Sequence, residues 1–419
     1  MRDLGRSLRA RGTRAAVVTL ATGALVACGT LLEVEAPSRI LEQTLLQPSN
    51  ATVLVAGAVA DFECALGNFV LTGGTLADEF SDSQANAATW DIDRRTNFPA
   101  TALFATGGCG GFGVYTPLSI ARFQADQALR LLDKWTDAEV PGRAALQAQA
   151  AAFAGYSYVL MGEMFCSCAF DLGPELQPGG VFALAEERFT RVINATGAPA
   201  DLRNLAFVGR ARARINQGKR TEAAADAAQV PAGFVYTAKT TAAAGRAENR
   251  IFRFNNTTGT VTVDSQFRAQ RVGDTPDPRV NVADAGRGGS LPAVRLWVQN
   301  KYRSLSDPIP MATWREAVLI RAEVAGGQTA VQLINQLRTA SNLPAFSSTV
   351  ETQIQAQVRE ERRRELFLEG HRLFDTIRFN LSLVPAAGSV FPNGGGNYGS
   401  NKCLPLPDVE RLNNPNIAG

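Results

Sequence analysis

The sequence predicts a mainly α protein, a scaffold of stacked helix pairs with an irregular region of loops and short strands packed on it. Two observations favour this fold class. Apolar residues recur with the period of a helix at about 115–230 and again at about 311–379. Between these stretches, at about 231–310, short β-like runs alternate with Gly, Pro and Asn. Hydrophobic residues make up 45% of the chain, which is enough to bury a substantial core.

The helices of the first half are predicted from their apolar faces and their end signals. Helical patterning begins near Ala51, and further on Ile120 and Phe123 fall on one apolar face. Gly218 is placed to end one helix, because glycine readily adopts the left-handed conformation found there, and Thr221 is placed to cap the next. These helices are expected at Ser119–Trp135, Ala144–Phe165, Phe182–Ala195, Asp201–Gln217 and Thr221–Val230.

Residues 205–230, LAFVGRARARINQGKRTEAAADAAQV, resemble one tetratricopeptide unit. Gly209 and Ala213 are small enough to let two helices approach closely, and the second helix is rich in alanine. One such unit cannot bury its own apolar face. The neighbouring helices are therefore expected to stack on it.

The second half is predicted to interrupt this scaffold and then resume it. β-like runs occur at Phe252–Phe254, Val261–Val263 and Val294–Val298, which favours a small hairpin or sheet. Helices are expected again at Met311–Ala325, Thr329–Ala340 and Val350–Phe379.

The C-terminal segment, 380–419, is rich in Gly, Pro and Asn and is predicted to be loop. Within it, residues 393–397 are expected to be flexible unless something covers them. Because helical segments lie on both sides of the irregular insertion, we expect a single domain over 51–419.

The first 27 residues have the form of a secretory signal. Arginines up to Arg14 precede an uncharged, mostly apolar stretch that is too short to span a bilayer stably. It ends in Leu25-Val26-Ala27-Cys28, which resembles the lipobox of bacterial lipoproteins. That resemblance implies that Cys28 becomes the first mature residue and carries the acyl chains that hold the protein at a membrane. Residues 28–50 then form a tether.

The overall charge gives no indication of nucleic-acid binding. Residues 1–27 carry five arginines against one aspartate, so removing them changes the formal net charge from +3 to −1. A nucleic-acid partner would require a clustered basic surface, which the rest of the chain lacks.

Five cysteines follow Cys28 in a chain that is predicted to be exported, where disulfides persist. Because five is an odd number, at least one of them is free or pairs outside the chain. Cys64 and Cys109 lie near glycine-rich turns and are the favoured pair. Cys166 and Cys168 are too close for an easy mutual bridge, and the pairing of Cys403 stays open. With a single histidine and no zinc-like spacing, neither a metal nor another cofactor is expected.

The most specific motif lies at residues 361–378, which read ERRRELFLEGHRLFDTIR. It closely resembles the helix signature of the SusD/RagB lipoproteins. Residues 311–346 and 402–417 are similar to the helix hairpin and the proline-rich closing segment of the same family, in the same order. The signature positions are Glu361, Arg362, Glu365, Glu369, Gly370, Arg372, Asp375 and Arg378.

The signature is expected to have a structural role. Glu361, Glu365 and Glu369 recur every four residues on one face of the predicted helix, within reach of arginines. We expect ion pairs to neighbouring loops to hold this helix while its apolar stripe enters the core. In the alternative reading, Glu365 and Glu369 are the acid and base of a glycosidase, but flanking arginines should keep their pKa values low. His371 has no catalytic partner motif and is expected to be packed or exposed.

The family resemblance implies a function. SusD/RagB members are outer-membrane lipoproteins that form a lid over a TonB-dependent barrel. This chain is therefore expected to be a non-catalytic, surface-facing protein with a lipid anchor. It would capture an oligosaccharide or a peptide nutrient and pass it to a SusC-like barrel.

A sugar ligand requires an aromatic face with polar side chains beside it. Residues 78–98 have this composition in a segment predicted to be an exposed loop. Trp90 is its central aromatic, although it could instead fill the seam between this loop and the helices. The candidate ligand contacts are Trp90, Asp78, Asn86 and Arg94, with Tyr398 and Trp297 as weaker candidates.

Two other classes of protein stay open. A helical-repeat scaffold lipoprotein for envelope assembly would share Cys28 and the repeat, but not the signature. A surface glycoside hydrolase would require a pair of carboxylates, and the signature helix offers the only candidate pair in the sequence.

Overall fold

The computed structural model describes residues 42–417, and contacts divide the chain into two units. The first unit ends at Gln47, and its described part contains one helical turn, α2 (Glu42–Leu45). The second unit begins at Pro48 and contains the elements described below. Cys28 and the predicted signal segment lie outside the described residues.

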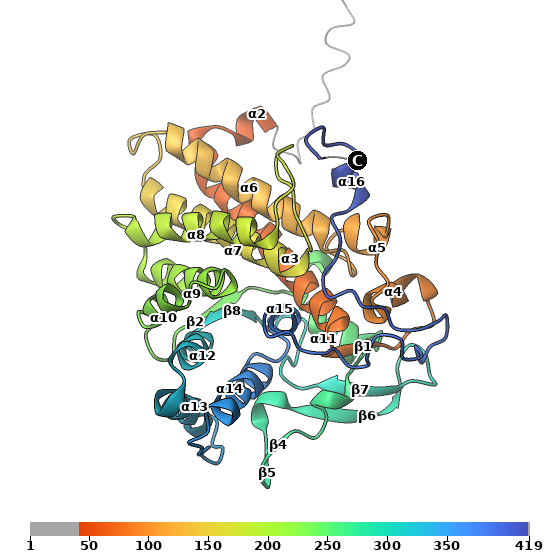
Figure 1. Cartoon of the computed structure of the whole chain (residues 1–419). Helices are drawn as coiled ribbons and strands as arrows, with labels where there is room; N and C mark the ends of the chain where they lie inside the picture. Colours follow the sequence, from red (N-terminus) through yellow and green to blue (C-terminus); the bar gives the residue numbers. More distant parts are fainter. Residues whose placement is uncertain (1–41, 418–419) are drawn as a thin grey trace, which may run out of the picture. The chain divides into compact units, whose positions relative to one another are not determined.

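Consecutive helices of the first half pack on one another. Their bounds are α3 (Ala51–Leu76), α6 (Tyr115–Lys134), α7 (Arg143–Met164), α8 (Pro178–Asn194), α9 (Ala200–Asn216) and α10 (Arg220–Ala227). Helix α3 packs on α6 and α7, and each helix from α6 to α10 packs on the next. Figure 1 shows this stack descending along one side of the second unit. The predicted mainly α class with repeat-like helix pairs is confirmed.

Small residues allow α7, α8 and α9 to approach closely. The ring of Phe189 on α8 is fully buried and lies against Gly155 of α7 and Gly209 of α9. A Cβ atom added at these glycines would come within 2.7 Å and 2.4 Å of that ring, far inside van der Waals contact. The prediction that Gly209 lets helices approach is confirmed.

A second group of helices continues the stack. Its members are α12 (Trp314–Ala325), α13 (Gly327–Ala340), α14 (Glu351–Glu365) and α15 (Arg372–Arg378). Helix α10 packs on α12, which in turn packs on α13 and α14. Leu319, Ile334 and Val358 are fully buried where these three helices meet. Apolar burial there, at about 25 cal/mol per Å² removed from water, holds α12, α13 and α14 together, and the packing of α10 on α12 joins this group to the first helices.

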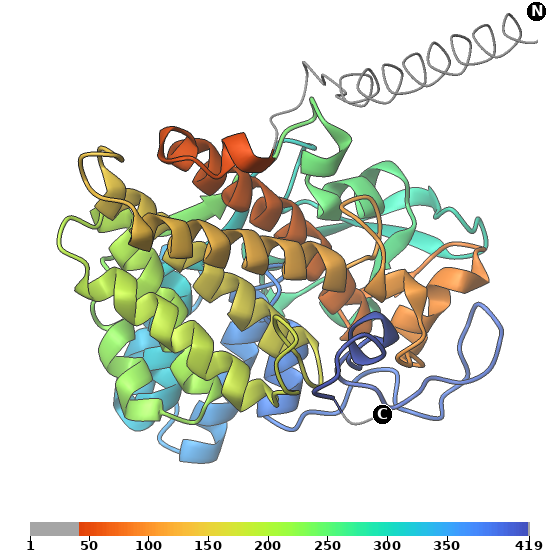
Figure 2. The same ribbon diagram turned by 90° about the horizontal axis from the view of Figure 1, so that it is seen from above.

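Short antiparallel strand pairs form the irregular region, and two of them connect distant parts of the chain. The strands are β1 (Phe80–Asp82), β2 (Val235–Ala238), β3 (Val261–Val263), β4 (Arg271–Val272), β5 (Thr275–Pro276), β6 (Val282–Gly288), β7 (Arg295–Gln299) and β8 (Ile309–Thr313). The pairs are β1 with β3 and β2 with β8, which connect the distant parts, and β4 with β5 and β6 with β7. Figures 1 and 2 place β1, β6 and β7 on one side of α3 and the helices α8 to α10 on the other. The irregular insertion is thus a set of two-stranded ribbons beside the helical scaffold.

The remaining described elements are single turns or short helices between these layers. They are η1 (Pro48–Asn50), η2 (Ala87–Thr89), α4 (Trp90–Arg94), α5 (Ala102–Ala105), η3 (Gly245–Ala247), α11 (Arg250–Phe252), η4 (Arg253–Thr257), η5 (Ser265–Phe267), η6 (Pro278–Val280) and α16 (Asp408–Arg411).

The helical segment Pro48–Leu76 is long and apolar enough to cross a membrane by length and composition alone. In the structure it is a core helix, because 61% of its most apolar window is buried against the rest of the fold. A buried core helix and a membrane span meet the same compositional test, and packing distinguishes them.

The signature segment differs from its prediction. A single helix was expected over Val350–Phe379, but α14 ends at Glu365 and α15 begins at Arg372. Leu368 and Gly370, between them, have φ values of 55° and 80°, which an α-helix cannot accommodate. Glutamates still recur every four residues through the break, so the sequence pattern gave no sign that the helix ends there.

Three smaller predictions are also wrong. Phe252–Phe254 is helical, because the side chain of Asn249 accepts a hydrogen bond from the Phe252 N–H at 3.0 Å and caps a turn. Lys219, not Thr221, occupies the N-cap of α10. Ile120 and Phe123 are 45% and 39% exposed instead of facing the core.

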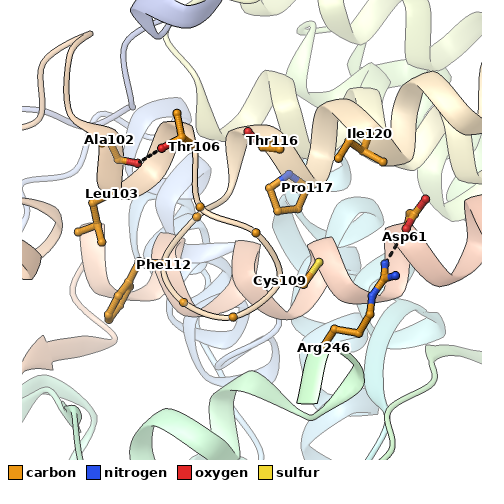
Figure 3. A pocket seen from close by; sticks show the side chains of 15 residues that line it. Asp61, Ala102, Leu103, Thr106, Cys109, Phe112, Thr116, Pro117, Ile120 and Arg246 are labelled. Carbon is orange, nitrogen blue, oxygen red and sulfur yellow. Dashed lines mark hydrogen bonds and ion pairs between the residues drawn. The ribbon is translucent and has the colours of Figure 1, made fainter. Parts of the chain in front are cut away.

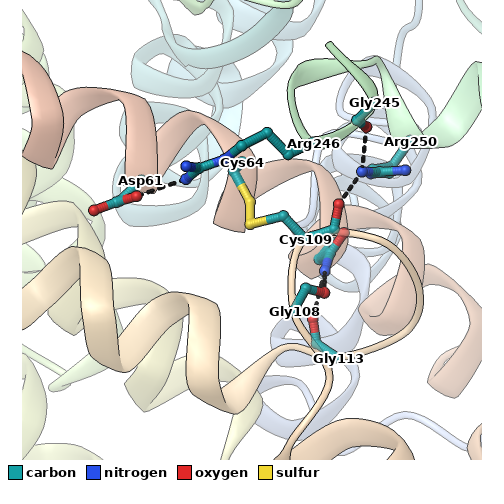
Figure 4. Close-up of a disulfide and its surroundings, with 9 residues drawn as sticks. Asp61, Cys64, Gly108, Cys109, Gly113, Gly245, Arg246 and Arg250 are labelled. Atoms are coloured by element: carbon teal, nitrogen blue, oxygen red, sulfur yellow. Dashed lines mark hydrogen bonds and ion pairs between the residues drawn. A yellow bond between two sulfur atoms is a disulfide. The ribbon is translucent and has the colours of Figure 1, made fainter. Parts of the chain in front are cut away.

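Two disulfides join distant segments. Cys64 on α3 pairs with Cys109, with a Cα–Cα distance of 5.8 Å, as the glycine-rich turns predicted (Figure 4). Cys166, just after α7, pairs with Cys403 in the C-terminal segment. Cys168 is buried and free, which accounts for the odd number.

Candidate functional site

The carboxylate of Glu361 lies at the centre of the charged network formed by the signature. Glu361 is fully buried on α14. Arg279 of η6 donates to one of its oxygens at 2.5 Å, and Arg338 of α13 pairs with the other at 2.7 Å. The signature therefore ties the irregular insertion and α13 to α14, as expected for a structural role.

The two carboxylates of the glycosidase alternative are also occupied by cations. Glu365 accepts from Arg279 at 3.1 Å on one oxygen and from Arg315 at 2.5 Å on the other. Glu369 lies in the turn after α14 and pairs with Lys301 at 2.6 Å. Burial raises the pKa of Glu369, with Lys301 opposing it, so the prediction of a low pKa is wrong for this residue. With both oxygens of Glu365 held by arginines, the arrangement is that of an ion-pair network.

The rest of the signature fastens α15 to the scaffold. Arg362 of α14 forms a buried, two-bond pair with Asp375 of α15, with a shortest distance of 2.9 Å. Arg378 pairs with Glu323 of α12 and with Asp375. These contacts satisfy buried charges across the break at Leu366–His371.

His371 is buried within the same network. Its Nε2 lies 3.3 Å from Nη1 of Arg212, and its Nδ1 lies 3.9 Å from Glu316. Burial and the nearby arginines lower the pKa of His371 well below its usual value, so the ring is neutral at neutral pH. His371 was expected to be either packed or exposed, and the structure supports the packed position.

The sequence-predicted ligand cluster lies in a seam between segments far apart in the chain. The Trp90 indole donates to the Gln84 carbonyl at 2.9 Å, and its ring lies 5.8 Å from that of Phe391. Phe391 in turn packs on Tyr398. A Cβ atom added at Gly395 would lie 3.4 Å from the Trp90 ring, so the glycine-rich segment at 393–397 lies beside this side chain, which stays partly exposed.

The six candidate ligand contacts do not all reach the surface. Asp78 is 2% exposed, and both of its oxygens are bound by Arg372, at 2.6 Å and 2.9 Å. Tyr398 is 4% exposed and lies under the guanidinium of Arg95. These two side chains therefore pack inside the fold and do not present an open face to a ligand. Asn86 is exposed, and Arg94 is partly exposed, donating to Asp91 and to the Gly395 carbonyl.

Buried acids lie beneath this seam, in the segment that was predicted to be an exposed loop. The backbone N–H of Asp82 donates to Asp93 at 2.7 Å, and both side chains are almost fully buried. Burial raises the pKa of Asp93 to about 8 and that of Asp82 to about 6. The segment 78–98 is thus a folded part of the core boundary. Trp297 on β7, one of the two weaker candidates, is half-buried, with Arg268 5.0 Å over its ring.

A surface hollow that was not predicted lies beside the glycine-rich loop at 107–113 (Figure 3). Its volume is about 760 Å³, and its walls are mainly apolar. The loop is held from behind by the Cys64–Cys109 disulfide and by Asn68, which donates to the carbonyls of Gly108 and Gly113. Arg246 and Asp61 form an ion pair at one end of the hollow. With few hydrogen-bonding side chains, this hollow is poorly suited to a polyhydroxylated ligand.

A second hollow, of about 690 Å³, lies over the signature carboxylates. Its walls are strongly polar, but most of its polar groups already bond to one another. Glu365 is held by Arg279 and Arg315, and Asn300 donates to Asn281 at 3.0 Å. No local motif in the sequence marks the first hollow, and the signature contributes only Glu365 and Glu369 to the second, because each is assembled from several segments.

Among residues 42–417, no group of His, Cys, Asp and Glu is arranged to hold a metal ion. The signature carboxylates described above pair with arginine and lysine side chains instead.

The comparisons with known proteins agree with the signature. Residues 316–403 match the model of the SusD family. A SusD-like carbohydrate binding protein from Bacteroides vulgatus superposes with a TM-score of 0.67 at 15% identity, covering 88% of this chain and 97% of that chain. A laminarin binding SusD-like protein gives a TM-score of 0.66 at 18% identity, covering 88% and 98%. A SusD superfamily protein from Parabacteroides distasonis gives 0.66 at 12% identity, covering 91% and 99%. No protein with curated annotation matches the chain.

These matches confirm the resemblance to the SusD/RagB family that the signature predicted, and the chain has the SusD-like fold. The fold extends over almost the whole length of those structures.

Proposed function

We propose that this protein is an outer-membrane lipoprotein that captures an oligosaccharide or peptide nutrient and delivers it to a TonB-dependent transporter. The observation that carries the proposal is the SusD-like fold, shared over nearly the full length of relatives that include a carbohydrate binding and a laminarin binding protein. A binding role also agrees with the signature network, whose carboxylates are engaged in ion pairs that stabilise the fold.

The capture step is tested by isothermal titration calorimetry of the mature protein with neutral and acidic oligosaccharides and with peptides. Saturable binding of one class, with no hydrolysis of the ligand, is the expected result. Cleavage of a glycan would instead favour the hydrolase alternative.

The delivery step is tested by mild detergent extraction of the tagged protein from its native membrane, followed by mass spectrometry. A stoichiometric TonB-dependent barrel is the expected partner. Recovery with envelope assembly factors and without a barrel would favour the scaffold alternative.

The lipid anchor at Cys28 is proposed from the lipobox alone. Cys28→Ala should release the body in soluble, folded form, because no acyl chains would then hold it at the bilayer. Retention of this variant in the membrane through detergent-free washing would refute the anchor.

A further inference from the structure

A third hollow, which we call the α3–β2 pocket, differs from the other two in its chemistry. It lies where α3, the start of α7, the start of α9 and β2 meet, and its volume is about 620 Å³. This size falls within the range of roughly 300–1,000 Å³ that ligand pockets usually have. The lining residues are Thr52, Ala56, Val59 and Glu63 of α3, Leu146 and Gln149 of α7, Asp201 of α9, and Phe234 to Thr237 with Lys239 around β2.

Helical geometry explains why α3 and α7 both face this pocket. The α3 residues are spaced by four, three and four positions, and the α7 residues by three, so each set lies on one helix face. Phe153, one turn beyond Gln149, packs edge-on against the Tyr236 ring at 6.3 Å and supports it from behind. Phe234 and Tyr236 are both partly exposed, so the pocket has aromatic surface on a supported wall.

The pocket has hydrogen-bonding capacity that the protein itself does not use. Within the described part of the chain, the Tyr236 hydroxyl and the Gln149 side-chain amide have no hydrogen-bond partner. Glu63 accepts one bond, from the Lys239 N–H at 2.8 Å, and Asp201 accepts one, from the Leu202 N–H at 2.9 Å. Each carboxylate therefore has a second oxygen available to a ligand.

Burial and the nearby carboxylates of Asp201 and Glu63 raise the pKa of Tyr236. Its hydroxyl consequently stays protonated at physiological pH and can donate as well as accept. The amide of Gln149 can do both, whereas the carboxylates only accept. A ligand with many hydroxyl groups can satisfy all of these at once, since each hydroxyl both donates and accepts.

We propose that the α3–β2 pocket is a subsite for a neutral oligosaccharide. One sugar ring would lie against the Tyr236–Phe234 wall, and its hydroxyls would bond to Gln149, Asp201 and Glu63. This inference rests on the proposed function and adds the place and the charge class of the ligand. Two carboxylates against the single Lys239 give the lining a net negative charge, which disfavours uronic-acid or sulfated glycans.

The test is calorimetry of the mature protein with laminarihexaose, maltohexaose and cellohexaose, followed by single variants on the best binder. Tyr236→Phe and Gln149→Ala each remove a neutral hydrogen bond and should raise Kd about twofold to tenfold. Asp201→Asn removes a charged acceptor yet can still accept from the Leu202 N–H, and it should raise Kd about tenfold. Gln332→Ala, at an exposed position of α13, is the matched control and should leave Kd unchanged.

The outcomes separate this inference from the proposed function. If a hexasaccharide binds and none of the three pocket variants changes Kd, the subsite is wrong while glycan capture stands. If none of the hexasaccharides binds while the wider titrations find an acidic oligosaccharide or a peptide, the neutral-oligosaccharide subsite is overturned and capture of that other nutrient stands. Thermal melting of each variant must match the parent, so that a change in Kd reports contact and not unfolding.

Discussion

At the scale of single residues, the most consequential feature is the set of buried charges that hold one another. Glu361 is fully buried and faces guanidinium groups from Arg279 and Arg338, which are themselves almost buried. Removing a buried charge leaves its partners uncompensated, which costs more than the pair contributes. The fold therefore requires every member of this ion-pair network, whether or not the network as a whole adds to stability.

Glu361→Ala should lower the free energy of unfolding by about 3–5 kcal/mol, because the buried Arg338 would lose the carboxylate it pairs with and Arg279 would keep only Asp277 and Glu365. The measurement is equilibrium denaturation in urea. Thr352→Ala, at an exposed position on the same helix, should change stability by less than about 0.5 kcal/mol. Equal stability of the two variants would contradict the role assigned to the network.

Asp93 gives a pH dependence whose sign follows from its environment. The folded protein keeps Asp93 protonated up to a pKa of about 8, whereas the unfolded chain releases this proton near the ordinary aspartate pKa of 3.8. Folding is therefore penalised increasingly as pH rises from about 4 to about 8. Asp93→Asn cannot ionise, so its stability relative to the parent should rise across this window, with a slope of up to about 1.4 kcal/mol per pH unit.

The measurement for Asp93 is urea denaturation at a series of pH values. Thr352→Ala, the exposed control above, removes no ionisable group, so its difference from the parent should stay constant with pH. A difference for Asp93→Asn that stays flat from pH 4 to pH 8 would exclude a raised pKa in the folded state.

At the scale of elements, the break between α14 and α15 is determined by Gly370. Its φ of 80° is favourable only for glycine, and an added Cβ would lie 2.6 Å from the Phe69 ring of α3. The turn therefore brings α15 close against the core helix, and Gly370 is the position in the bend that only glycine can occupy without strain.

Gly370→Ala should destabilise the protein by about 2–4 kcal/mol, since it combines backbone strain with overlap against a buried ring. Gly57→Ala is the matched control on α3, because its added Cβ meets nothing within 4 Å. That variant should stabilise the helix by about 0.5–1 kcal/mol. Thermal or chemical denaturation of both should give opposite signs, and loss of stability in both would mean that the Gly370 geometry is not the cause.

Periodicity in the sequence identified most helices but not where tertiary structure interrupts them. The helices α6 to α9 were predicted to within a few residues, because each has a continuous apolar face and a clear end, such as Gly218 with a φ of 78°. The break at Gly370 was missed, since glutamates spaced by four look helical even when Glu369 pairs with Lys301 from a turn.

The candidate site was harder to predict than the fold. Trp90 and Tyr398 were selected from composition, and the structure does bring them into one cluster through Phe391. Composition could not show that Asp78 and Tyr398 are buried. The α3–β2 pocket is assembled from α3, α7, α9 and β2, so no local pattern marks Gln149 or Tyr236 as neighbours.

At the scale of the whole molecule, the C-terminal segment closes the fold. Leu404 exchanges backbone hydrogen bonds with the end of α7, and Asn393 donates to the Asp82 carbonyl at 2.9 Å. The Cys166–Cys403 disulfide fixes the same closure covalently. A segment that is rich in Gly, Pro and Asn is thus held in place by contacts with residues hundreds of positions earlier.

The stability contributed by this disulfide follows from the length of chain that it closes. Cys166 and Cys403 are 237 residues apart, so the bridge removes a large loop-closure entropy from the unfolded chain. The double variant Cys166→Ser/Cys403→Ser should lose about 2–5 kcal/mol under oxidising conditions, and it should become sensitive to proteases first within 380–417. Limited proteolysis with mass spectrometry locates the cuts, and reduction of the parent provides the comparison. Cleavage that begins in the helical stack instead would mean that the C-terminal segment is held by its hydrogen bonds alone, with the disulfide stabilising the α7 end of the scaffold.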